Sequence, residues 1–311
     1  MERKTQFDVV VVGGANSDYT VKGPRLPMPG ETVEADDFLE AFGGKGANQA
    51  VCCARLGARV AFIGRVGSDA RGEAIIKNFH EQKVDSRFVR RDPVAATGAA
   101  VIMVDASGEK EIASAPGANQ RVSSDDINRS SSQLRSTKVL LMQYEIPTVA
   151  VIRAAEIARR AGALIMIDPA PARPTPKRLL HLIDVVRPNT SEARTLTGIN
   201  IRDEKDARRA TLKLFAAGLK MVGFQIGDRG DLLLWPGGQE WLPRLKVRTV
   251  DATGAGDAFA AGLAVALAEG KSFAEAGKFA NATAALATTK LGAQPSLPTR
   301  SQVLALLRKQ R

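Results

Sequence analysis

Short apolar segments alternate with segments of helical periodicity along most of this sequence, and this alternation constrains the fold more than any other feature. Several of the apolar segments, such as Val9–Val12 and Leu164–Ile167, are apolar at every position. Strands have this character when helices cover both faces of a parallel sheet. The sequence therefore predicts an α/β fold with a Rossmann-like, mostly parallel central sheet between two layers of helices. We expect a single domain over residues 1–311.

The predicted elements follow each other at regular spacing. Strands are expected near residues 7–13, 60–66, 138–143, 163–168, 183–187, 220–226 and 231–235. Helices are expected near residues 45–57, 69–83, 147–161, 189–197, 203–217, 255–269, 272–289 and 299–310.

Two segments interrupt the alternation. Residues 16–42 contain three prolines and have no helical pattern. Residues 96–115 contain two strand-like runs, 99–104 and 111–115, joined by Asp-Ala-Ser-Gly, which is typical of a hairpin. We expect 16–42 and 96–115 to leave the main sheet and to pair as a small β-sheet lid. Ordinary surface loops are the alternative.

The predicted lid hairpin is apolar on both faces, because Val101 and Met103 alternate with Ile102 and Val104. An exposed sheet edge and an apolar face are liabilities in a monomer. One face would cover a ligand and the other would need a partner. We therefore predict a homodimer joined through the lids.

Composition excludes several classes of protein. The net charge is +11, but the basic residues are spread along the chain and aromatic residues make up only 5%, so we expect no nucleic-acid partner. No apolar run approaches the ~20 residues of a membrane span, and the charged N-terminus has no signal-like segment, so we expect a cytoplasmic protein without a membrane partner. The adjacent Cys52 and Cys53 suit a reducing compartment.

The segment DATGAGDAF, residues 251–259, has the clearest chemical content. A strand-like run is followed by a glycine turn, the carboxylate of Asp257 and an alanine-rich helix. Backbone N–H groups at a helix N-terminus form an anion site, and glycines allow a phosphate to approach closely. A carboxylate in that turn suits a group that takes a proton from a hydroxyl attacking the phosphate. Helix capping by Asp257 is the alternative interpretation.

A second glycine turn, AFGGKGANQA at residues 41–50, places Lys45 and Asn48 in the first turn of a helix. An asparagine side chain both donates and accepts hydrogen bonds, which suits sugar hydroxyls. Asn16 and Asp18 follow the first strand, at the end where ligands bind in open α/β sheets, and alternate residues of an extended chain point the same way. Glu145 ends another predicted strand and could add a hydroxyl contact. Capping or turn roles are the alternative.

Two further turns complete the predicted site. Asn189 and Glu192 lie three residues apart at a predicted helix start, where their oxygens suit Mg²⁺ held through water, although a capping box is the simpler interpretation. The turn Gly227–Gly230 joins two strand-like runs and could lie under ATP phosphates or form a plain hairpin.

Taken together, these segments resemble the ribokinase-like (PfkB-type) family of carbohydrate kinases over the whole length of the chain. Residues 41–72 resemble the N-terminal signature of that family and DATGAGDAFAAGLA, 251–264, resembles the C-terminal one. The shorter segments PMPGETV (27–33), PGAN (116–119), DPAPA (168–172), RPNTSEARTLTGI (187–199) and GAQPS (292–296) also match.

The resemblance implies roles for individual residues. Asp257 would be the catalytic base, with Gly254, Ala255 and Gly256 as the anion hole. The sugar would be bound by Asn16, Asp18, Gly44, Lys45, Asn48 and Glu145. ATP would be bound by Asn189, Gln225, Gly227, Asp228, Arg229, Gly230, Gly256 and Asn281. Asn189 and Glu192 would serve Mg²⁺, and K⁺ would be held by Asp251, Thr253, Ala287, Lys290, Gly292 and Ser296.

The implied activity is transfer of the γ-phosphoryl group of ATP to the 5-hydroxyl of D-ribose, giving D-ribose 5-phosphate, with Mg²⁺ and K⁺ as cofactors. Another acceptor within the family (deoxyribose, a ketohexose or a nucleoside) and a non-catalytic sugar sensor are the alternatives. The sequence departs from the common family pattern at Gln225, Ala252 and Asp168, where the family often has Thr, Thr and Asn. None of these departures removes a catalytic group.

Overall fold

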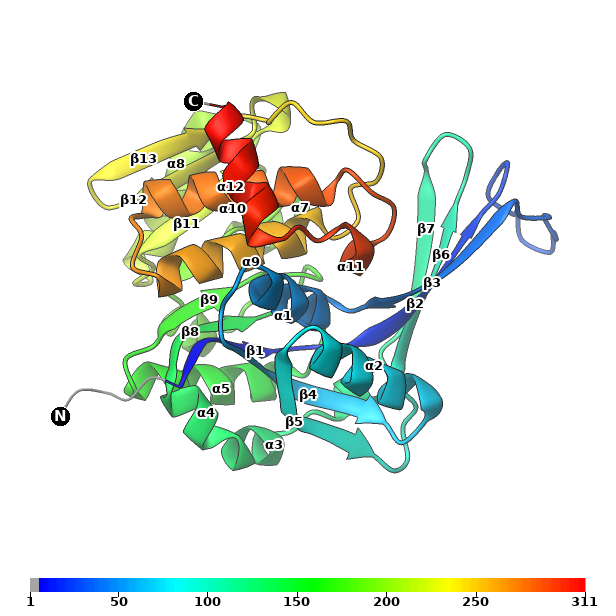
Figure 1. The fold of residues 1–311 in the computed structure, drawn as a ribbon. Helices are drawn as coiled ribbons and strands as arrows, with labels where there is room; N and C mark the ends of the chain where they lie inside the picture. The colour runs from blue at the N-terminus through cyan, green and yellow to red at the C-terminus, as the bar shows by residue number, and fades with distance from the viewer. Residues whose placement is uncertain (1–5, 311) are drawn as a thin grey trace.

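A computed structural model describes residues 6–310 of the chain and shows two separate β-sheets (Figure 1). The larger sheet has the strand order β13-β12-β11-β10-β9-β8-β1-β4-β5. In this order, every neighbouring pair between β11 and the edge strand β5 is parallel. Strand β12 pairs antiparallel with both β11 and β13. The strands are β1 (Phe7–Val12), β4 (Val60–Gly67), β5 (Val84–Asp92), β8 (Thr137–Met142), β9 (Leu164–Ile167), β10 (Val185–Val186), β11 (Met221–Gln225), β12 (Asp231–Trp235) and β13 (Gly238–Leu242).

Helices cover both faces of the larger sheet, as the alternating pattern predicts. One layer contains α1 (Lys45–Arg55), α2 (Ala70–Glu81), α9 (Ala255–Ala268), α10 (Phe273–Ala287) and α12 (Arg300–Lys309), and these helices share one apolar core with the sheet. The opposite layer contains α3 (Ser124–Arg129), α4 (Ser131–Arg135), α5 (Thr148–Arg160), α6 (Lys177–Leu180), α7 (Thr190–Thr197) and α8 (Glu204–Ala216). The short helix α11 (Ala293–Ser296) and the 3₁₀ turns η1 (Gly117–Arg121) and η2 (Gly227–Arg229) lie at the ends of other elements.

The packing of strand β1 explains why the run Val9–Val12 is apolar at every position. Val9 and Val11 belong to one core, whereas Val10 and Val12 belong to the other, and all four side chains are fully buried. Successive side chains of a strand point to opposite faces of the sheet, so a strand covered on both faces needs no polar position. Burying each such side chain contributes about 1.5–3 kcal/mol to folding.

The smaller sheet projects from the body on one side (Figure 1). Its strand order is β3-β2-β6-β7, with β2 (Asn16–Lys22), β3 (Asp37–Gly43), β6 (Gly98–Val104) and β7 (Lys110–Ala115). The expectation that the two interrupting segments pair as a small sheet is confirmed, and the alternative of surface loops is wrong. Ile102 is only 8% exposed, whereas Val101, on the other face, is 45% exposed.

The strands β5 and β13 and the short helices α3, α4, α6 and α11 are not predicted from the sequence. The expectation of a strand-like run before Asp251 is wrong, because residues 243–249 form no strand. Both strands lie at the edges of the larger sheet, where one side of the strand has no neighbour. The sequence of β5, Val-Asp-Ser-Arg-Phe-Val-Arg-Arg-Asp, is mostly polar because much of this edge faces water. Within residues 6–310, no helix is both long enough and apolar enough to span a lipid bilayer.

Candidate active site

The carboxylate of Asp257 is held in a fixed position at the start of α9. It is 5% exposed and lies in the first turn of the helix. Asn48 Nδ2 donates a hydrogen bond of 2.9 Å to Asp257 Oδ2, and Gln49 Nε2 donates one of 3.1 Å to Oδ1. Lys45 Nζ is 3.9 Å from Oδ1. Two neutral amides and one ammonium group, all from the first turns of α1, therefore orient this carboxylate.

The glycine turn before α9 has the geometry of an anion site. Gly254 has φ +82°, and a Cβ there would lie 3.1 Å from Ala293 Cα, so only glycine suits the position. A Cβ at Gly256 would meet no atom within 4 Å, which leaves open space next to the helix N-terminus. The amide of Ala255 donates to Ala252 O at 3.2 Å and so already has a backbone partner.

A cavity of about 70 Å³ lies beside this turn and brings together groups from four predicted site segments. Its lining includes Lys45, Asp168, Asn189, Glu192 and Gly256. Positive charge, helix N-terminal amides and carboxylates thus meet in one place.

Asn189 and Glu192 form the capping box that the simpler interpretation predicts. Glu192 Oε2 accepts from Asn189 N at 2.8 Å, and Asn189 Oδ1 accepts from Glu192 N at 2.9 Å. Both residues nevertheless line the same cavity as Gly256. Capping holds the two side chains rigid and does not prevent their remaining oxygen lone pairs from binding water or an ion.

The residues predicted to bind sugar lie around the same carboxylate. Asn16 and Asp18 are on β2, and the backbone of Gly44 packs so closely on this strand that a Cβ would lie 2.8 Å from Asn16 N. Lys45 N donates a hydrogen bond of 2.7 Å to Glu145 Oε2. Asn119 Nδ2 donates one of 2.8 Å to Asn16 Oδ1. The N-terminus of α1, β2 and the segment after β8 therefore converge.

Three carboxyl groups near Asp257 have raised pKa values. Burial raises the pKa of Asp18 to about 6, and the charge of Asp257 adds to the effect. Burial also raises the pKa of Glu145 to about 7 and that of Asp168 to about 6; in both cases Lys45 opposes the shift and Asp257 reinforces it. Burial alone would lower the pKa of Lys45, but the surrounding carboxylates raise it above its ordinary value. Lys45 thus stays charged and balances this acidic cluster.

The turn that begins at Asp251 contacts the turn at Gly292. Asp251 Oδ1 accepts from Thr253 N, and Oδ2 accepts from Gly292 N, each at 2.9 Å. Ser296 Oγ donates to Ala293 O at 2.7 Å, Ala287 is buried, and Lys290 is exposed. The ammonium group that contacts this turn is that of Lys110, at the start of β7, 3.3 Å from Thr253 Oγ1.

Residues 225–230 of the predicted ATP-binding set lie at and after the end of β11, whereas Asn189 and Gly256 line the cavity and Asn281 is on α10. Arg244 Nη2 donates to Gly227 O at 3.2 Å, and Asn281 Nδ2 donates to Pro243 O at 2.8 Å. The guanidinium of Arg229 lies 4.2 Å from the centroid of the Trp241 ring. Gln225 ends β11, Gly230 has φ +100°, and the side chain of Asp228 lies outside the described part of the structure.

Four residues of this region carry no predicted role, although three of them lie in quoted motifs and Gln143 ends a predicted strand. Gln143 Nε2 donates to Gln49 Oε1, and Gln49 Nε2 also donates to Asp168 Oδ2 at 2.8 Å. Asn119 binds Asn16, and Arg187 Nε donates to Asp231 Oδ2 at 2.8 Å while lining the cavity. Their polar character inside apolar surroundings was the available signal.

Comparisons with known proteins agree with this geometry. The model of the pfkB family of carbohydrate kinases matches residues 6–300. A ribokinase of Haemophilus influenzae is 39% identical over 305 residues, which cover 98% of this chain and 99% of that protein. A deoxyribokinase of Salmonella typhi is 31% identical over 297 residues, or 95% of this chain and 97% of that protein. The solved structure of Arabidopsis thaliana ribokinase complexed with ribose and ATP is similar with a TM-score of 0.89 and 36% identity, covering 97% of this chain and 99% of that one.

The fold and the site are those of a carbohydrate kinase: a parallel α/β body, a small separate sheet, and a carboxylate at a glycine-lined helix N-terminus. The chain belongs to the pfkB family of carbohydrate kinases. The resemblance inferred from the sequence motifs is therefore confirmed, as is the predicted fold class.

Proposed function

We propose that this protein transfers the γ-phosphoryl group of ATP to the 5-hydroxyl of D-ribose and releases ADP and D-ribose 5-phosphate. The observation that carries the proposal is the fixed position of the Asp257 carboxylate, which Asn48 and Gln49 hold beside the open space at Gly256. Similarity to full-length ribokinases supports ribose as the acceptor.

In the proposed mechanism, Asp257 takes the proton of the ribose 5-hydroxyl as its oxygen attacks the γ-phosphorus. The new O–P bond forms while the bond from the γ-phosphorus to the β,γ-bridging oxygen breaks, and ADP leaves with that oxygen. A general base of this kind typically contributes about 10²–10⁴-fold. The amides at the start of α9 and the Lys45 ammonium group stabilise the charge of the transferring group.

Sugar binding would depend on Asn16, Asp18, Asn48 and Glu145, which offer acceptors and donors to the ribose hydroxyls, with Gly44 allowing close approach. The nucleotide would lie along Gln225–Gly230 and Asn281. These assignments rest on the contacts described above and on the family signatures.

Two metal ions would assist. Mg²⁺ neutralises phosphate charge, and Asn189 and Glu192 would hold it through water, as suits their oxygen donors. Among residues 6–310, no group of three or more His, Cys, Asp or Glu side chains is arranged to hold a metal ion. K⁺ would be held by Asp251, Ser296 and backbone oxygens of Thr253, Ala287, Lys290 and Gly292, an oxygen-rich set that suits a large cation.

The small sheet would act as a lid that keeps water from the reaction, with 16–42 and 96–115 as its two parts in a single-domain enzyme. We also propose a cytoplasmic homodimer joined through the lids. The exposed side chains of Phe38 and Val101, at 65% and 45%, lie on the same face of the small sheet and support an apolar contact there.

An acceptor panel tests the proposal. The purified protein is supplied with ATP and Mg²⁺, and ADP formation is measured with ribose, 2-deoxyribose, fructose and adenosine. Deoxyribose is the second candidate acceptor, because a deoxyribokinase is among the relatives. We expect the highest kcat/KM with ribose. A higher value with another acceptor would replace ribose, and no ADP formation with any of them would favour a sugar sensor.

A further inference from the structure

A second and larger cavity, of about 530 Å³, lies at the base of the small sheet. Ser17 and Phe42, which face each other in the β2–β3 register, line one wall. They alternate along their strands with Asn16, Asp18 and Gly43, so this cavity is on the other face of the sheet from the sugar-binding residues. Figure 1 shows α1, α2 and α11 gathered around this base.

The opposite wall presents hydrogen-bond donors that lack acceptors. Gln294 on α11 is 4% exposed, and its Nε2 atom has no partner in the described structure, whereas its Oε1 accepts from Asn78 Nδ2 at 2.9 Å. Buried side-chain donors are rarely left unpaired in folded proteins. Because Gln294 lines the cavity, its free N–H groups point to an acceptor that enters from outside the protein.

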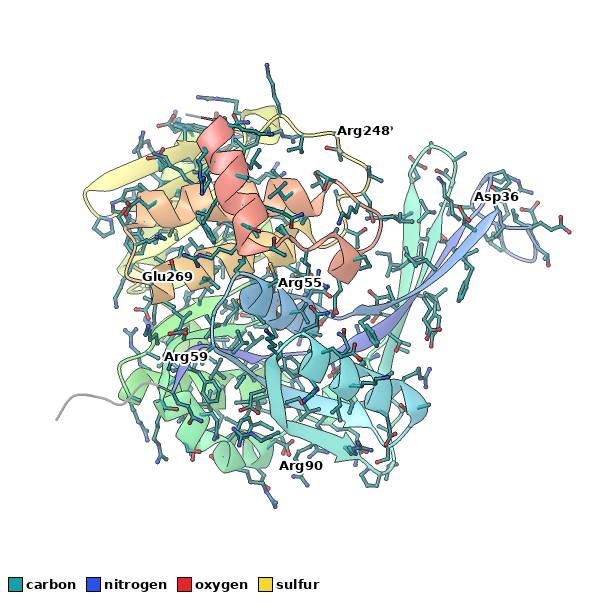
Figure 2. All side chains as sticks on the ribbon, viewed as in Figure 1. Asp36, Arg55, Arg59, Arg90, Arg248 and Glu269 are labelled. Atoms are coloured by element: carbon teal, nitrogen blue, oxygen red, sulfur yellow. The ribbon has the colours of Figure 1, made fainter. Side chains whose placement is uncertain are left out.

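Two guanidinium groups line the same cavity. Arg55, labelled on α1 in Figure 2, is part-buried; its Nε donates to Gln82 Oε1 and its Nη1 to the carbonyls of Gln294 and Leu297. All these acceptors are neutral, and within residues 6–310 no carboxylate lies within ion-pair distance of Arg55. Arg71 on α2 makes only a loose ion pair, 3.5 Å from Asp69. Glu40 is the one acidic residue of the lining, and it is exposed.

We propose that this cavity is a binding site for a small organic anion, whose phosphate or carboxylate oxygens accept hydrogen bonds from Arg55, Arg71 and Gln294. Guanidinium groups pair with both kinds of oxyanion in a planar, two-point geometry. The volume exceeds that of an inorganic ion and suits a metabolite the size of a sugar phosphate or a tricarboxylic acid.

The position of the cavity gives the bound anion a route to the active site. Gln294 is two residues from Gly292, whose N–H donates to Asp251 beside the glycine turn of α9. Ser17 lies between Asn16 and Asp18 on β2. An anion held between α11, α2 and β2 would therefore link the base of the small sheet to that turn. An effect of the anion on phosphoryl transfer through that turn rests on the proposed function, whereas binding of the anion does not.

Calorimetric titration of the purified protein tests the binding. The probes are inorganic phosphate, ribose 5-phosphate and citrate, each titrated with and without saturating ribose and a non-hydrolysable ATP analogue. Arg71→Ala removes one guanidinium, and Ala74→Trp fills the cavity from the exposed side of α2. Arg87→Ala, which removes another exposed arginine paired with an aspartate, is the matched control.

We expect saturable binding of at least one probe to the wild type and to Arg87→Ala, with affinity reduced about tenfold or more in Arg71→Ala, since a charge-assisted hydrogen bond is lost. Ala74→Trp should abolish binding while its thermal midpoint stays close to that of the wild type. Preference for the phosphates or for citrate identifies the class of anion. The site is disproved if no probe shows saturable binding at millimolar concentration, or if Arg71→Ala and Ala74→Trp bind the probe as tightly as the wild type does. It is also disproved if the ATP analogue displaces the bound probe completely.

Discussion

Asn48 and Asp257 are 209 positions apart in the sequence, yet Asn48 Nδ2 donates a hydrogen bond of 2.9 Å to the Asp257 carboxylate. This bond joins the first turn of α1 to the first turn of α9. Because the carboxylate is also bonded to Gln49, its orientation is set by two residues of one helix before any ligand binds. Such preorganisation is what a positioned base requires.

Gln49 should be a positioning residue for the base. Its side chain is fully buried and its Nε2 bridges Asp257 and Asp168, so Gln49→Met keeps the volume and removes both of these bonds, together with the acceptor for Gln143 Nε2. We expect kcat to fall by about 10- to 100-fold, as for small misplacements of reacting groups, with little change in KM for ribose or ATP. Steady-state kinetics decide the matter, with Gln133→Met on α4 as the control. An unchanged kcat would assign Gln49 a packing role only.

Asp18 should determine ribose affinity. Asp18→Ala leaves a sugar hydroxyl without its acceptor, which costs about 1–3 kcal/mol, so the KM for ribose should rise by about tenfold or more. The KM for ATP should stay near the wild-type value. Thr20→Ala, two residues along the same face of β2, is the matched control for the two substrate titrations. Equal effects on ribose and ATP would contradict a specific sugar contact.

Glu145 should make the stability of the ligand-free protein depend on pH. Its pKa is raised from the ordinary value of 4.5 to about 7 because it is buried; Lys45 opposes the shift, and Asp257 and Asp18 add to it. The folded state therefore binds this proton more tightly than the unfolded state, and stability falls as pH rises from about 4.5 to about 7.

Glu145→Gln removes that proton but keeps an oxygen that accepts the bond from Lys45 N. As the pH rises through this range, the thermal midpoint of the variant should rise relative to that of the wild type. Above this range the difference between the two midpoints should stay constant. Thermal denaturation at a series of pH values gives the comparison. Parallel curves for the two proteins would mean that the Glu145 carboxyl titrates normally.

Asp251 should link activity to the monovalent cation. Its carboxylate bridges Thr253 and Gly292 and so holds the turn before α9 in place. We expect a higher rate in K⁺ than in Na⁺ at fixed ionic strength, and we expect Asp251→Ala to abolish the difference. Asp251→Asn, which keeps the size of the side chain, separates loss of charge from loss of packing. Equal wild-type rates in the two salts would leave Asp251 a purely structural residue.

Whether an element of the fold can be predicted from the sequence depends on how deeply it is buried. Strand β9 and the Val9–Val12 part of β1 are covered on both faces, are apolar throughout and are predicted from the sequence. Strand β5 is not predicted, because its edge position tolerates Arg and Asp. In the site, residues inside glycine turns were predicted from chemistry and resemblance.

The network Gln143–Gln49–Asp168 was not predicted, since a buried glutamine becomes visible only when tertiary packing brings its partners together. The contact of Lys110 with Thr253 has the same origin, because it joins the small sheet to a turn 143 residues away.

The turnover of Asp257→Asn, measured together with its ribose affinity, tests the central claim most directly. The substitution keeps the shape of the side chain and the acceptor for Asn48 but removes the base. We predict that kcat falls by about 10²–10⁴-fold while the dissociation constant for ribose, from calorimetry, changes little. A variant that turns over ATP and ribose at a near-normal rate would contradict the assignment of Asp257 as the base and with it the proposed mechanism.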